Sequence, residues 1–170
     1  SGESPFRDGV VQYSSTSGLP ETNQAFLNMI SSSGLETRGL HSQITDGGSS
    51  AMELVLIGTC GFDKPRPVLL IEPAYTNYRS MCERLRIPNV AVRRKLLEDG
   101  SFSLPDLNHI RSLIEKSRPA AIVVIPYDNP TGQYFDIPTM RSLAALCVEH
   151  NLWMISDEAY RELHYAKGPS

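Results

Sequence analysis

Four short polar segments in this 170-residue chain combine residue types that bind charged or aromatic ligands. Each follows a stretch that is predicted as a β-strand from its apolar and β-branched residues. Ligands of parallel α/β sheets bind beyond the carboxyl ends of the strands, so we expect the four segments to form one site. The segments are Asp46-Gly47-Gly48-Ser49, Glu72-Pro73-Ala74-Tyr75, Asp128-Asn129-Pro130-Thr131-Gly132 and Asp157-Glu158-Ala159-Tyr160.

The segment Gly47-Gly48-Ser49-Ser50 precedes a predicted helix. Backbone N–H groups without side-chain bulk, the positive end of the helix dipole and two hydroxyls would face an anion such as phosphate. An ordinary glycine turn followed by a serine N-cap explains the same residues. The segment alone does not decide between the two interpretations.

Tyr75 and Tyr78 follow Pro73 just after a predicted buried strand. Either ring could stack on a planar ligand at the spacing of about 4.5–7 Å that aromatic pairs adopt. Packing in the core explains both residues equally well.

The turn around Asn129 ends the strongest predicted strand of the chain. Its proline and glycine favour a tight turn that directs the asparagine side chain away from the sheet, where the amide could donate to a phenolate-like oxygen. A capped turn without a ligand is the alternative.

Asp157 comes directly after an apolar strand, where burial of a carboxylate costs several kcal/mol unless a cation or hydrogen-bond donors meet it. A protonated pyridine nitrogen is such a cation. Alternatively, the carboxylate is solvated or caps the next helix.

Strand-like and helix-like stretches alternate along the chain, which favours an α/β fold. We predict three layers, with helices on both faces of a mostly parallel sheet. Residues 1–8 are interpreted as a tag or a disordered N-terminus, and residues 9–170 as one partial domain. The predicted strands are 43–45, 68–71, 89–92, 120–125 and 152–155, and the predicted helices are 20–30, 50–57, 77–85, 103–116 and 136–150.

The composition argues against several classes of protein. The net charge of -3 provides no general attraction to nucleic acid or to an anionic membrane, and no apolar run reaches the ~18 residues that span a bilayer. Cys60, Cys82 and Cys147 are widely spaced and lack a CxxC pattern, so neither a disulfide framework nor a metal site is indicated. We therefore expect a small-molecule ligand and a cytoplasmic location.

From about Gly9 onward the chain resembles the class I/II, fold-type I aminotransferases, the aspartate aminotransferase superfamily, which depend on pyridoxal phosphate (PLP). The segments Asn129-Pro130-Thr131-Gly132 and Ser156-Asp157-Glu158-Ala159-Tyr160 carry the resemblance, because their combination at this separation is highly specific. Three further segments reinforce it: Tyr13-Ser14-Ser15-Thr16-Ser17-Gly18-Leu19-Pro20-Glu21, Gly47-Gly48-Ser49-Ser50-Ala51-Met52 and Pro73-Ala74-Tyr75-Thr76-Asn77-Tyr78.

The resemblance implies a role for each matching residue. Gly47, Gly48, Ser49 and Ser50 would hold the cofactor phosphate, and Tyr75 would stack on the pyridine ring. Asn129 and Tyr160 would bind the phenolic oxygen of that ring, and Asp157 would pair with its nitrogen and keep it protonated. Asp157 and Tyr160 are the catalytic residues expected in this chain. Tyr13 would reach across the interface of a homodimer to the phosphate of the partner.

The resemblance also exposes departures. The Schiff-base lysine of the family lies a few dozen residues beyond the position of Asp157, and Lys167, the one lysine after Asp157, has the wrong spacing for that role. The arginine that binds the substrate carboxylate lies further on and is also missing. Tyr75 stands where the aspartate enzymes have tryptophan, which argues mildly against aspartate as the favoured substrate.

We therefore expect a fragment of an enzyme that transfers an amino group from an amino acid to a 2-oxo acid. The fragment alone would be inactive. The alternatives are a PLP-dependent lyase of the same fold and a non-catalytic PLP-binding or regulatory domain.

Overall fold

A computed structural model describes residues 13, 15–161 and 163 of the chain. They fall into two compact units that divide between Ala51 and Met52. The interpretation of residues 1–8 and the exclusion of Lys167 as a catalytic residue concern positions outside the described residues. Within the described part, no helix combines the length and the apolar character needed to cross a membrane.

The first unit contains helix α1, Pro20–Ser32, and the first four residues of helix α2, Gly48–Cys60. Pro20 begins α1, where the missing N–H costs no intrahelical hydrogen bond. Gly18 has a φ of +89°, and a Cβ atom at this position would lie 2.7 Å from Cβ of Ile44. The turn before α1 therefore requires glycine, since any side chain would be strained and would collide with Ile44.

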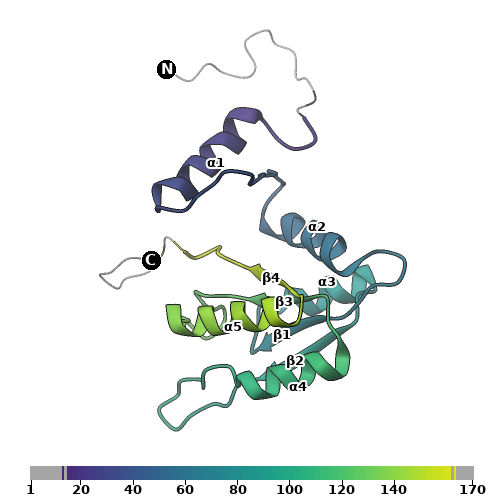
Figure 1. Ribbon diagram of the computed structural model, residues 1–170, viewed down its shortest axis with the longest axis vertical. Coiled ribbons are helices and arrows are strands. Elements are labelled where there is room, and N and C mark those ends of the chain that lie inside the picture. Colours follow the sequence, from purple (N-terminus) through teal and green to yellow (C-terminus); the bar gives the residue numbers. More distant parts are fainter. Residues whose placement is uncertain (1–12, 14, 162, 164–170) are drawn as a thin grey trace. The chain divides into compact units, whose positions relative to one another are not determined.

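The second unit is built on a sheet of four parallel strands (Figure 1). The strand order is β2-β1-β3-β4. Because all four strands run in one direction, their carboxyl ends lie along the same edge of the sheet, where the loops that follow them meet. The strands are β1, Val68–Glu72; β2, Asn89–Arg93; β3, Ala121–Val124; and β4, Trp153–Ser156.

Helices connect the strands, and two of them begin at an aspartate N-cap. Asp106 accepts hydrogen bonds from the backbone N–H groups of Asn108 and His109 at 3.0 and 3.1 Å. Asp136 accepts one from the N–H of Thr139 at 2.9 Å. These carboxylates satisfy N–H groups that have no partner within the helix. The helices between the strands are α3, Asn77–Leu85; α4, Leu107–Ser117; and α5, Ile137–Glu149.

Two apolar layers cover the opposite faces of the sheet. Val68 and Leu70 of β1 pack with buried residues of α2 and α3, whereas Leu69 and Ile71 pack with those of α4 and α5. Successive side chains of a strand point to opposite faces, and β1 is buried on both, so its sequence is continuously apolar. The predicted three-layer α/β fold with a parallel sheet is confirmed.

The structure corrects three local predictions. Residues 43–45 form no strand, because they pair with no other strand and the backbone N–H of Ile44 donates to the carbonyl of Ser17, which lies in the turn before α1. The described residues therefore contain four strands rather than the five predicted. The helix predicted to begin at residue 103 begins at Leu107, because Asp106 caps it by accepting from the N–H groups of its first turn. Helix α2 begins at Gly48, two residues before the predicted start at Ser50, so Gly48 and Ser49 belong to its first turn.

Candidate functional site at the carboxyl edge of the sheet

The loops after β3 and β4 bring Asn129 and Tyr160 together. The Nδ2 atom of Asn129 lies 3.3 Å from the hydroxyl oxygen of Tyr160 and donates to it. Asn129 is half-buried, whereas Tyr160 is exposed. Because an amide N–H and a phenol O–H lie side by side, a single oxygen atom of a ligand could accept from both groups.

Asp157 is held where β4 ends. Its backbone N–H donates to the carbonyl of Val124 on β3 at 2.8 Å, which extends the ladder between the two strands. Its Oδ1 accepts from the N–H of Ala159 at 3.1 Å, and its Oδ2 accepts from the hydroxyl of Tyr78. The carboxylate is half-buried and is anchored at both oxygens.

Tyr78 lies in the first turn of α3 and is 2% exposed. Burial, followed by the hydrogen bond to Asp157 and the charge of that carboxylate, raises the pKa of the Tyr78 hydroxyl far above its usual range. The phenol therefore stays protonated and donates to Asp157 throughout the ordinary pH range. We interpreted Tyr78 from the sequence only as an aromatic residue, and its role as a donor was missed.

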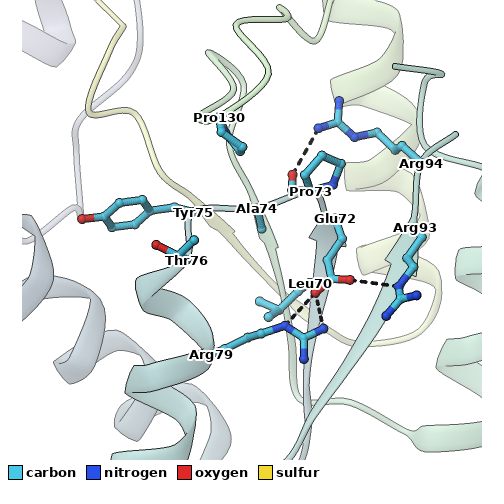
Figure 2. A pocket seen from close by; sticks show the side chains of 10 residues that line it. All are labelled: Leu70, Glu72, Pro73, Ala74, Tyr75, Thr76, Arg79, Arg93, Arg94 and Pro130. Atoms are coloured by element: carbon cyan, nitrogen blue, oxygen red, sulfur yellow. Dashed lines mark hydrogen bonds and ion pairs between the residues drawn. The ribbon is translucent and has the colours of Figure 1, made fainter. Parts of the chain in front are cut away.

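Tyr75 contacts Tyr78 edge to face, with ring centroids 5.8 Å apart. The Nδ2 of Asn77 donates to the Tyr75 hydroxyl at 2.9 Å. Tyr75 also lines a pocket of about 490 Å³ whose wall includes Pro130 (Figure 2). Asn129, Asp157 and Tyr160 are not among the residues that line this pocket, which are Leu70, Glu72, Pro73, Ala74, Tyr75, Thr76, Arg79, Arg93, Arg94 and Pro130.

A buried ion pair lies beneath the turn that carries Asn129. Arg94 follows β2, and its guanidinium binds the carboxylate of Asp128. The two side chains are 1% and 3% exposed. Neither was chosen as a site residue from the sequence, because Arg94 stands in a run of three basic residues after the predicted strand 89–92, and nothing in that run shows which side chain is buried.

The remaining predicted site residues belong to the first unit. Gly47 has a φ of +114°, a conformation that favours glycine, and Gly48, Ser49 and Ser50 form the first turn of α2. The free N–H groups of such a turn bind anions. The Tyr13 side chain is fully exposed.

Comparison with known proteins identifies the family. A model of the family described as aminotransferase class I and II matches residues 7–169. The chain belongs to this family. The 2-aminoadipate transaminase of Thermus thermophilus is 30% identical over 158 residues, which cover 92% of this chain and 36% of that protein. The probable aspartate aminotransferase of Methanocaldococcus jannaschii is 28% identical over 163 residues, which cover 94% of this chain and 41% of that protein.

Solved structures of aminotransferases share the fold. The alanine aminotransferase of Pyrococcus furiosus superposes with a TM-score of 0.78 at 26% identity, covering 96% of this chain and 40% of that structure. The tyrosine aminotransferase of Leishmania infantum superposes with a TM-score of 0.80 at 23% identity, covering 93% and 43%. The chain spans about two-fifths of the length of the curated relatives above, which it covers to 36% and 41%.

Proposed function

We propose that the protein is a PLP-dependent aminotransferase, which moves an amino group from an amino acid to a 2-oxo acid, and that this chain supplies part of its cofactor pocket. The main support is the contact between Asn129 and Tyr160, next to the strand that presents Asp157, in a chain of the class I and II aminotransferase family. The two adjacent donors suit a phenolate oxygen, and the anchored carboxylate suits a pyridinium nitrogen.

The residues of the chain fit a ring that carries a phosphate, an oxygen anion and a protonated nitrogen. Tyr75 is half-buried at the same edge of the sheet and would lie against the ring face. Gly47, Gly48, Ser49 and Ser50 would bind the phosphate through the first turn of α2. Asn129 and Tyr160 would donate to the ring oxygen, and Asp157 would accept from the ring nitrogen.

In this proposal Asp157 acts on protonation. When bound, the cofactor supplies a conjugated ring that accepts an electron pair from the substrate Cα. The negative charge of Asp157 would favour the protonated form of a ring nitrogen held against it. The hydroxyl of Tyr78 donates to the Asp157 carboxylate and holds it in one orientation. The raised pKa of this hydroxyl keeps its proton in place.

Other groups complete the site in this proposal. The lysine that attaches the cofactor and the arginine that binds the substrate carboxylate would come from outside these 170 residues, so the chain alone would not transaminate. Tyr13 would serve the site of a partner subunit in a homodimer, a role for which an exposed phenol is suited. The three described cysteines are free and buried, which supports a reducing, cytoplasmic environment.

The test is an amino-transfer assay on the full-length protein. The protein would be incubated with PLP, a panel of amino acids and a panel of 2-oxo acids, and the new amino acid would be detected by mass spectrometry. Stoichiometric formation of a new amino acid and a new 2-oxo acid is expected. Release of ammonia with cleavage of the side chain would instead indicate a lyase. Cofactor binding without turnover would indicate a binding or regulatory domain.

The same assay on the 170-residue chain tests its predicted inactivity. Turnover by this chain with PLP present would contradict the proposal that a further lysine is required. The full-length protein is the matched positive control.

A further inference from the structure

The guanidinium of Arg94 contacts two loops besides its own. One of its terminal nitrogens, Nη2, donates to the backbone carbonyl of Pro73 at 3.2 Å and also binds the carboxylate of Asp128 (Figure 2 shows the contact with Pro73). The other, Nη1, lies 3.5 Å from Oε1 of Gln133. The loops after β1, β2 and β3 therefore meet at one side chain.

The contacts with Pro73 and Asp128 lie close in sequence to predicted site residues. Pro73 lies two residues before Tyr75 in the same segment, and Asp128 directly precedes Asn129. The Thr131 hydroxyl donates to the same Asp128 oxygen from the other side of Asn129. The carboxylate thus holds the turn on both flanks of the asparagine.

The turn is closed further by its own backbone. The N–H of Gly132 donates to the carbonyl of Asp128 at 2.8 Å, and the N–H of Asp128 donates to the carbonyl of Gln133 at 2.9 Å. The Gln133 side chain binds the backbone of Phe102, accepting at 2.9 Å and donating at 2.7 Å. Arg94 therefore binds a turn that is held by its own hydrogen bonds, so a shift of Arg94 would also move Asn129.

Burial makes this arrangement specific. The Arg94 guanidinium carbon lies 5.6 Å from the ring centroid of Phe102 and 5.3 Å from that of Phe135. Its Nε has no hydrogen-bond partner among the described residues, so the terminal nitrogens carry the bonding. The planar fork reaches Pro73 and Asp128 through Nη2 and Gln133 through Nη1, whereas a lysine ammonium has one nitrogen and cannot span both positions.

We propose that Arg94 and Asp128 are positioning residues that couple the loop of Tyr75 to the turn of Asn129, so that the two cofactor contacts keep a common geometry. The inference rests on the proposed function, since the coupled residues are its proposed cofactor contacts. Arg94 and Asp128 act through Tyr75 and Asn129 and touch no reacting atom.

The first test needs no cofactor. Hydrogen exchange would be measured on the full-length apoprotein and on its Arg94→Lys variant, which keeps the charge and removes the fork. We expect the amides of Asp128 and Gly132 to exchange at least about tenfold faster in the variant, with the segment 74–78 also less protected. Unchanged exchange in both segments would overturn the proposal. Arg111→Lys is the matched control, because Arg111 lies on α4 in a partly exposed pair with Glu149.

The second test measures cofactor geometry. With Arg94→Lys we expect about a tenfold higher dissociation constant for PLP and a weaker visible circular dichroism band of the bound cofactor. We also expect kcat to fall more than KM changes. A variant that only melts at lower temperature, with wild-type affinity and dichroism well below its melting point, would show a purely structural role and overturn the proposal.

A milder pair of variants covers the case in which Arg94→Lys does not fold. Thr131→Val removes one donor to Asp128 without changing a charge, and Thr131→Ser restores it. Faster exchange and a weaker dichroism band in Thr131→Val, with recovery in Thr131→Ser, would support the proposal, and equal behaviour of the two would overturn it. A wild-type protein that binds no PLP would refute the proposed function, whereas normal turnover with unchanged exchange in Arg94→Lys would refute this inference alone.

Discussion

The hydroxyl of Tyr78 donates a hydrogen bond to Oδ2 of Asp157, linking the first turn of α3 to the loop after β4 across 79 sequence positions. Tyr78 also packs edge to face against Tyr75. One buried side chain thus connects the predicted ring-stacking residue with the predicted partner of the ring nitrogen.

Replacing Tyr78 with phenylalanine tests this connection. The ring packing would remain, but Asp157 would lose one of its two anchors, and a single hydrogen bond contributes about 1 kcal/mol. We expect kcat in the amino-transfer assay to fall about fivefold to tenfold with little loss of thermal stability. Tyr134→Phe is the control, since Tyr134 is an exposed phenol in the turn after β3. Equal rates in the two variants would argue against a role for the Tyr78 hydroxyl.

Replacing Asp157 with alanine tests the proposed pairing with the ring nitrogen. Because the carboxylate would favour the protonated ring in every turnover, we expect kcat to fall about 100-fold or more, the size seen when one electrostatic stabiliser is removed. PLP should also dissociate faster. Asp99→Ala, which removes a carboxylate from an exposed turn, should leave both quantities unchanged. Wild-type turnover by Asp157→Ala would contradict the assignment.

The buried cysteines predict a loss of stability in alkaline solution. Burial raises the pKa of the thiols of Cys82 and Cys147 from 9.0 to about 11. As the pH rises through this range, the unfolded chain ionises first and is favoured, so the contribution to stability is complete below pH 9.0 and is lost toward about 11. Denaturant unfolding at successive pH values would measure the slope.

Cys147→Ala should make that slope shallower, whatever its effect on stability at neutral pH. The comparison of slopes, rather than of absolute stabilities, separates ionisation from the loss of packing. An unchanged slope would show that this thiol does not contribute.

The N-cap of α4 gives a prediction that is independent of the cofactor. Asp106→Ala would leave two N–H groups of the first turn without their acceptor, and we expect it to lower the free energy of unfolding by about 1 kcal/mol. Asp106→Asn keeps a capping oxygen and should retain most of the stability. Equal destabilisation by both variants in denaturant titrations would contradict a capping role.

Local pattern was sufficient for most elements of the second unit. Helix α3 spans the predicted residues 77–85, and the apolar run of β1 was assigned to within one residue. Burial on both faces imposes such patterns on the sequence itself. The prediction of a strand at 43–45 was wrong because a strand needs a neighbouring strand to pair with, and local β propensity does not show whether one is present.

The sequence by itself determined the family, the alternation of strands and helices, and the carboxyl edge where polar loops gather, since these follow from short-range patterns and motifs. Only the tertiary structure decided which distant groups pair, namely Tyr78 with Asp157 and Arg94 with Asp128. The choice of partner depends on the strand order β2-β1-β3-β4, because each pair joins segments that follow two strands with one other strand between them, β1 and β4 in the first pair and β2 and β3 in the second. Burial then decides whether a polar side chain needs a partner. Neither the strand order nor the burial of a side chain can be read from the residues next to it in sequence.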